Sequence, residues 1–152
     1  MEAVGETAPA LPAPFVHSLL TEAREWLGTP YGHACREKGI AVDCIGLIIG
    51  ALREIGRLSY DNRSYSPEED PALLRAELER FCVEVALPVP GDFCLFEIGR
   101  VTRHVGIVGV ESSGERTLIH CYQSANRVVE HLFDHHWQRR VVAVYRWAGE
   151  ER

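Results

Sequence analysis

Residues 44–55 read CIGLIIGALREI and contain the longest apolar run of the chain, Ile45–Leu52. A helix over this segment is apolar on nearly every side, so we expect it to be buried against a sheet. Gly56 follows directly and is a typical residue for a helix end. The apolar run is far too short to cross a bilayer, which takes about 20 residues. The sequence therefore predicts a central buried helix over Cys44–Ile55, in a soluble protein with no membrane insertion.

Two more helices are expected before residue 90. Apolar residues recur at helical spacing over Val16–Leu27, and Gly28 follows where a left-handed cap is expected. A further helix is predicted over Pro67–Cys82, because Ser66 is a suitable cap and a proline and two glutamates occupy the first turn. Leucines follow at helical spacing.

From Pro90 onward the apolar period changes from helical spacing to two, which is typical of strands. Turn-forming residues separate the strands, so we expect an antiparallel meander. The predicted fold class is α+β, with N-terminal helices packed on a C-terminal antiparallel β-sheet. The strands are expected over Phe93–Ile98, His104–Val110, Thr117–Tyr122, Val128–Leu132 and Val141–Trp147.

Length and composition fit one globular domain, since the chain has 152 residues and 46% of them are hydrophobic. We expect the domain to span residues 16–152, after a flexible Ala/Pro-rich arm over residues 1–15. A net charge of -6 disfavours nucleic-acid binding, which needs clustered Lys and Arg. The arm lacks the basic and apolar regions of a signal peptide, so we expect synthesis in the cytoplasm without signal-directed export.

Cys44 is the cysteine whose position most favours chemistry. The chain holds five cysteines and no C-x-x-C pair, so we expect at least one thiol outside any disulfide. A thiol at the start of a helix meets the positive end of the helix dipole and unpaired N–H groups. These lower its pKa and can hold an oxyanion. The alternative is that Cys44 is a small core residue, the commonest fate of a lone cysteine.

His104 and His120 lie on two expected strands that a turn over Glu111–Arg116 joins. If the strands pair, both imidazoles lie near one face, where one accepts a proton and the other fixes its tautomer. With Cys44 they form a candidate Cys-His-His relay, although each histidine alone is more often a satisfied strand residue. His135 and His136 form only a weak metal-binding tract. The other histidines are expected at the surface or in loops: His17, His33, His131, His135 and His136.

Five ordered motifs resemble those of the NlpC family of cell-wall cysteine peptidases, and the likeness runs from about residue 16 to the end. Within that family the chain is most similar to the short peptidases of tailed phages and gene transfer agents, because of four parts of its late segment: Val128–His131, Trp137, Arg139-Arg140 and Val144-Tyr145-Arg146. The five motifs are Gly28-Thr29-Pro30-Tyr31-Gly32, Asp43-Cys44-Ile45-Gly46-Leu47, Pro90-Gly91-Asp92-Phe93, His104-Val105-Gly106-Ile107 and Leu118-Ile119-His120.

This resemblance implies a papain-like α+β core and hydrolysis of peptidoglycan stem peptides, typically at the γ-D-glutamyl–diaminopimelate bond, without a cofactor or metal. Carried over by position, Cys44 is the nucleophile, His104 the base and His120 the residue that orients the base. Tyr31 matches a tyrosine that lines the site, where its hydroxyl can help to hold the oxyanion or the stem peptide.

The residues at two positions leave the details of substrate binding undecided at this point. Asp43 matches an aspartate that binds the ammonium of a stem peptide in some members, but it equally suits a helix N-cap. Members commonly have serine after the nucleophile, whereas this chain has Ile45. The backbone N–H donors and the helix dipole do not depend on that side chain, so we still expect activity.

Two other functions compete with a peptidase that digests peptidoglycan. The chain is a structural tail-tip or baseplate subunit if the fold is retained mainly for assembly. It is a zinc protein if Cys44, His104, His120 and one further ligand bind the metal, which the absence of paired-ligand spacing disfavours. No wall-binding repeat is recognisable in the sequence, so we expect delivery by a phage-tail-like particle, with tail-tip or baseplate proteins as partners.

Overall fold

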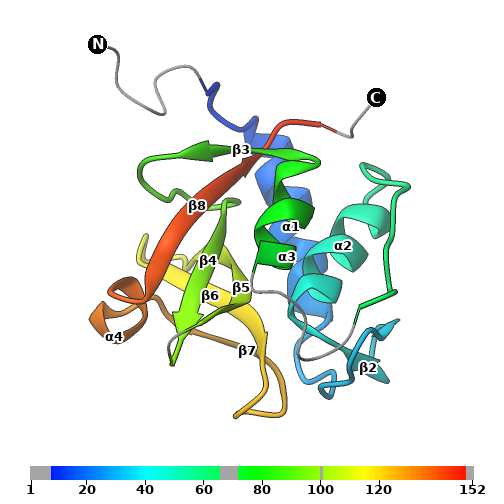
Figure 1. Cartoon of the computed structure of the whole chain (residues 1–152). Helices are drawn as coiled ribbons and strands as arrows, with labels where there is room; N and C mark the ends of the chain where they lie inside the picture. Colours follow the sequence, from blue (N-terminus) through cyan, green and yellow to red (C-terminus); the bar gives the residue numbers. More distant parts are fainter. Residues whose placement is uncertain (1–7, 66–71, 100, 150–152) are drawn as a thin grey trace.

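The computed structural model of the chain describes residues 8–65, 72–99 and 101–149, with no side chains described at 101–103. Within these ranges an antiparallel sheet carries α1, α2 and α3 on one face and the short α4 on the other (Figure 1). The helices are α1 (Ala13–Glu25), α2 (Cys44–Glu54), α3 (Ala72–Glu79) and α4 (His135–Gln138). The strands are β1 (Arg36–Glu37), β2 (Ala41–Val42), β3 (Cys82–Val85), β4 (Phe93–Ile98), β5 (Val101–Val110), β6 (Arg116–Tyr122), β7 (Arg127–Leu132) and β8 (Val141–Trp147).

The first helix begins at Ala13 and not at Val16. Residues 13–15, which were expected in the flexible arm, therefore belong to the helix. Prolines are tolerated in the first turn of a helix, where the backbone N–H has no intrahelical partner, and α1 has one there. Phe15, which we had assigned to the arm, is 1% exposed and packs in the main core. Residues 1–7 of the predicted arm lie outside the described residues.

Helix α3 covers only part of the helix expected over Pro67–Cys82. Residues 66–71 lie outside the described part, and Cys82 begins β3. Cys82 pairs with Trp147 of β8 across the sheet. That partner is far away in the sequence, so helical spacing upstream gave no sign of the strand.

The sheet has the strand order β3-β8-β4-β5-β6-β7, with antiparallel neighbours throughout. The meander is confirmed for β4 to β7. The last strand departs from it, because β8 returns between β3 and β4 after the turn made by α4.

Alternation along the strands divides the interior into two apolar clusters. Val105, Ile107 and Cys121 belong to the cluster under α1, α2 and α3. Val108, Leu118 and Trp137 belong to the cluster on the opposite face, beneath α4.

Candidate active site

Cys44 is the first residue of α2, which packs on β5 and β6. Asp43 is the N-cap, and its Oδ1 accepts the backbone N–H of Gly46 at 2.8 Å. The Cys44 thiol is half-buried and receives backbone N–H groups from Ile45 and from Val105, the residue after His104. The structure therefore places the thiol at the start of the helix and next to the strand that carries His104.

The charge state of Cys44 differs from our expectation. Burial, and then the nearby Asp43 carboxylate, raises its pKa to about 12, because the two backbone N–H groups lower it by less. Burial also lowers the pKa of His104 to about 3. In the absence of substrate the site therefore holds a neutral thiol and a neutral imidazole at pH 7, and the predicted thiolate is a wrong prediction.

His104 and His120 lie together, as the sequence predicts. Nε2 of His104 is 2.6 Å from Nδ1 of His120, and both side chains are buried. Gly106 explains the close approach, because a Cβ at this position would lie 3.1 Å from the Cβ of His120 and 2.8 Å from Leu118. Burial, followed by the neighbouring His104 and His131, lowers the pKa of His120 to about 2. This imidazole pair is neutral and tightly packed.

His131 extends the pair to a third ring, which corrects its prediction as a surface or loop residue. Its Nε2 lies 2.8 Å from Nε2 of His120, and its Nδ1 lies 2.8 Å from the carbonyl oxygen of Leu132. His131 sits within β7, opposite Leu118 of β6. Only the register between these two strands brings it beside His120, and this register is not visible in the local sequence pattern.

Trp137 and Tyr122 enclose the imidazoles on the face away from α2. The Trp137 ring lies edge-on to His120, with centroids 4.8 Å apart, and within 5.9 Å of both His104 and His131. Tyr122 stacks on His120 with an interplanar angle of 19°. Trp137 is held by α4, whose N-cap Asp134 accepts the Trp137 backbone N–H. These aromatic rings keep water from the histidines, which explains the lowered imidazole pKa values.

Tyr31 and Asp43, the expected substrate-binding residues, both lie near the thiol. Burial, and then the charges of Asp43 and Cys44, raise the pKa of Tyr31, so its hydroxyl is protonated at neutral pH. Tyr31 forms a bridge with Val42, at the end of β2. Asp43 is 4% exposed, which places its carboxylate below the surface.

The Asp43 carboxylate already has four donors, which the sequence did not reveal. Besides Gly46, its oxygens accept the backbone N–H of Ala34 at 2.7 Å, the Arg36 guanidinium at 3.1 Å and the Tyr65 hydroxyl. The Arg36–Asp43 ion pair is buried on both sides. Of the two roles left open for Asp43, the structure displays the N-cap. The ammonium-binding role stays a prediction.

Ile45 stands where family members commonly have serine, and it points into the core. Its side chain is 3% exposed and belongs to the apolar cluster under the helices. The departure from the common serine therefore adds apolar packing behind Cys44.

No group of three or more His, Cys, Asp or Glu in the described ranges could hold a metal ion, His135 and His136 included. In the same ranges, no helix has the length and hydropathy to cross a membrane. None of the five cysteines forms a disulfide.

The geometry can be compared with known proteins. A sequence search matches residues 28–146 to the NlpC/P60 family, a span that includes Cys44, His104 and His120. The chain belongs to the NlpC/P60 family. No curated protein matches the full sequence at a significant level.

Solved NlpC/P60 structures share the papain-like α+β fold. An NLP/P60 protein from Staphylococcus aureus, described as similar to a lipoprotein, has a TM-score of 0.67 and 18% identity over 95% of this chain. The chain spans 45% of that protein. The NlpC/P60 domain of the peptidoglycan hydrolase SagA has a TM-score of 0.57 and 18% identity, covering 85% of this chain and 96% of that domain. NlpC1 from Trichomonas vaginalis has a TM-score of 0.64 and 17% identity, covering 91% and 46% of the two chains.

Proposed function

We propose that this NlpC/P60 chain is a cysteine peptidase that hydrolyses the stem peptides of peptidoglycan. The observation that carries the proposal is the placement of Cys44 at the start of α2, where its thiol is hydrogen-bonded to the backbone N–H of Val105, the residue after His104, whose ring contacts His120. The expected nucleophile thus lies beside the strand that carries the expected base, and the base contacts its expected orienting residue, which supports nucleophilic catalysis. The description of SagA as a peptidoglycan hydrolase supports the choice of substrate.

The reaction begins from the neutral pair. The Cys44 thiol gives its proton to Nδ1 of His104 as sulfur attacks the scissile carbonyl, so an S–H bond breaks while an N–H and a C–S bond form. His104 then donates that proton to the leaving amine, and water hydrolyses the acyl-enzyme. Backbone N–H groups in the first turn of α2 and the Tyr31 hydroxyl are the donors for the oxyanion.

The finer substrate assignment is the γ-D-glutamyl–diaminopimelate bond, as the family resemblance implies. Tyr31 is half-buried and lies near the thiol, so its hydroxyl can contact a stem peptide. Asp43 contributes through the shape and charge of the loop that it fixes with Arg36.

Digestion of purified peptidoglycan, followed by mass analysis of the released fragments, tests the activity and identifies the bond. We expect Cys44→Ala to release no fragments. Cys35→Ala is the matched control, since Cys35 is also half-buried but lies outside the helix. Equal digestion by the Cys44 variant and the parent enzyme would show that another group carries the reaction.

We also propose that a phage-tail-like particle delivers the enzyme to the wall, with tail-tip or baseplate proteins as partners. The support is the likeness of residues 128–146 to phage and gene transfer agent peptidases, and the net charge of -6 suits a protein partner better than an anionic wall polymer. Particles purified from producing cells should contain the chain. Its consistent absence from intact particles would leave the delivery proposal without basis.

A further inference from the structure

His104, His120 and His131 form a row of imidazoles, and the last of them contacts a backbone carbonyl oxygen. This last contact determines which nitrogen of each ring carries hydrogen. Nδ1 of His131 lies 2.8 Å from the carbonyl oxygen of Leu132. A carbonyl oxygen can only accept, so Nδ1 of His131 must carry hydrogen. In a neutral histidine the second nitrogen is then an acceptor. When the His131 ring is neutral, its Nε2 therefore presents a lone pair toward His120.

The same logic passes along the row. Nε2 of His120 lies 2.8 Å from the lone pair of His131, so it must donate, which leaves Nδ1 of His120 as an acceptor. Nε2 of His104 lies 2.6 Å from that acceptor and must donate in turn. The remaining nitrogen of His104, Nδ1, keeps its lone pair. A base that takes the proton of a thiol needs this form of the ring.

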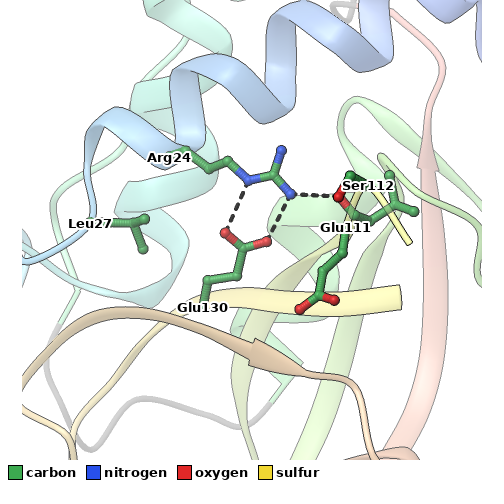
Figure 2. Close-up of a pocket in the computed structure, with 6 residues that line it drawn as sticks. Arg24, Leu27, Glu111, Ser112 and Glu130 are labelled. Atoms are coloured by element: carbon green, nitrogen blue, oxygen red, sulfur yellow. Dashed lines mark hydrogen bonds and ion pairs between the residues drawn. The ribbon is translucent and has the colours of Figure 1, made fainter. Parts of the chain in front are cut away.

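The frame around His131 is rigid. Its neighbour Glu130 is held from α1 by Arg24, whose Nε and a terminal nitrogen donate at 3.0 and 2.8 Å, and from β6 by the Thr117 hydroxyl at 2.6 Å. Figure 2 shows the Arg24 side chain extending from the helix to the strand, where it is hydrogen-bonded to both carboxylate oxygens of Glu130. The Trp137 ring packs 5.8 Å from His131 on the other face of the sheet. His131 thus lies on a strand that Arg24 and Thr117 hold through Glu130, and its ring contacts Trp137.

We propose that His131 is a positioning residue of the peptidase: through the Leu132 carbonyl it sets the tautomers of His120 and His104, so that Nδ1 of His104 stays unprotonated and able to accept the proton of Cys44. The catalytic part of this inference rests on the proposed function. The tautomers themselves do not, because they follow from three contacts within the protein.

Tautomer control matters here because the rings are neutral. Burial lowers the pKa of both His104 and His120, so neither carries a charge at pH 7 that would protonate both nitrogens. A neutral imidazole has two tautomers, and only one of them makes His104 a base on the side of the thiol. Without an acceptor at residue 131, nothing in this row selects between them.

The first test needs no substrate. Nitrogen NMR of the full chain with ¹⁵N-labelled histidine distinguishes the two tautomers of each ring. We expect Nε2–H for His104 and His120, and Nδ1–H for His131. Observation of Nδ1–H at His104 in the parent protein would overturn the inference, whatever the enzyme hydrolyses.

The second test compares two substitutions of His131 by stem-peptide hydrolysis. His131→Leu removes the acceptor, and losing this part-buried hydrogen bond should lower kcat about tenfold with little change in KM. His131→Gln supplies an amide oxygen at a similar reach, so it should recover most of the lost kcat. His135→Leu is the matched control, because His135 is an exposed histidine on the adjacent α4 and should behave as the parent.

The outcomes separate this inference from the proposed function. Parent activity in His131→Leu, or an equal loss in the leucine and glutamine variants, would refute the positioning role while leaving the peptidase assignment intact. A parent enzyme without peptidase activity would refute the assignment, and NMR of the same variants would still decide the tautomers. If His131→Leu does not fold, the parent NMR spectrum and the glutamine variant decide.

Discussion

Two opposing effects act on the pKa of the Cys44 thiol: the helix N-terminus lowers it and burial raises it. The effect of burial is the larger. A helix N-terminus contributes about 0.3–2 kcal/mol toward a negative charge, which is at most roughly 1.5 pKa units. The burial of Cys44 acts in the opposite direction and carries its pKa from 9.0 to about 12. In the proposed mechanism the helix therefore positions the sulfur and presents N–H groups to the oxyanion, and His104 removes the thiol proton during the reaction.

This division of labour predicts unequal effects for the two histidines. His104→Ala should lower kcat by about 10²–10⁴-fold, the usual contribution of proton transfer by a positioned base. His120→Ala should lose less, since it removes orientation and leaves the base in place. His120→Asn should be milder still, because an amide oxygen can accept from Nε2 of His104. The measurement is kcat on a stem peptide for each variant.

Folding controls accompany these variants, since both side chains are buried. Each must keep the near-ultraviolet circular dichroism of the parent before its rate is compared. A folded His104→Ala variant that hydrolyses at the parental rate would contradict the assignment of His104 as the base.

At the scale of the elements, the start of α2 depends on the loop before it. Arg36 binds Asp43 at 3.1 Å and Asp61 at 3.1 Å, which ties the helix cap to a segment far along the chain. Gly46 leaves room for this contact, because a Cβ there would lie 2.7 Å from both the Arg36 guanidinium and the Asp43 oxygen. The cap of α2 is thus a buried polar network that holds Cys44 in place.

Removal of the Arg36 charge should therefore be costly. We expect Arg36→Met to lower the free energy of unfolding by about 3 kcal/mol, because it leaves the buried Asp43 carboxylate without its cation. Lys38→Met is the control, since the ion pairs of Lys38 with Glu22 and Glu25 lie nearer the surface and contribute about 1 kcal/mol or less. Urea unfolding monitored by tryptophan fluorescence gives both values. Similar losses in the two variants would mean that the Asp43 network is not selectively stabilising.

The elements that the sequence predicted well are those whose signal is local. The buried helix starts at Cys44 as expected, and the limits of β4 and β8 agree with the predicted strands Phe93–Ile98 and Val141–Trp147. What was missed depends on distant partners: β3 needs β8, and the place of His131 needs the register of β7 against β6. Burial has the same character, because the side chains that pack around Cys44 come from several elements at once.

At the scale of the whole molecule, the sheet separates two environments that meet at the start of β5. The three longer helices cover one face, where Cys44 packs on the main core, whereas α4 covers the other face and packs Trp137 against the imidazoles. The catalytic proposal therefore needs both layers. A change in the α4 layer, far from the sulfur in sequence, acts on the base through the packing of Trp137 against all three rings.

The two layers also make the stability of the molecule depend on pH, and the direction follows from the buried histidines. In the folded protein the pKa of His104 is about 3 and that of His120 about 2, against about 6.5 for a histidine in an unfolded chain. Below pH 6.5 the unfolded chain takes up protons that the folded protein cannot. The free energy of unfolding therefore decreases as the pH is lowered. The loss stops only near the folded pKa values. Between pH 7 and pH 5 each imidazole should cost about 2 kcal/mol.

A single substitution isolates this contribution. His120→Asn removes one of the two buried imidazoles, so the fall in unfolding free energy from pH 7 to pH 5 should shrink by about 2 kcal/mol relative to the parent. His135→Asn is the control, because His135 is exposed on α4 and lies outside the buried row, so this variant should leave the fall unchanged. Urea unfolding at a series of pH values, at constant ionic strength, measures both. If His120→Asn lost as much stability between pH 7 and pH 5 as the parent, His120 would have to accept a proton within the folded sheet. The packing of Tyr122 and Trp137 around that ring argues against this outcome.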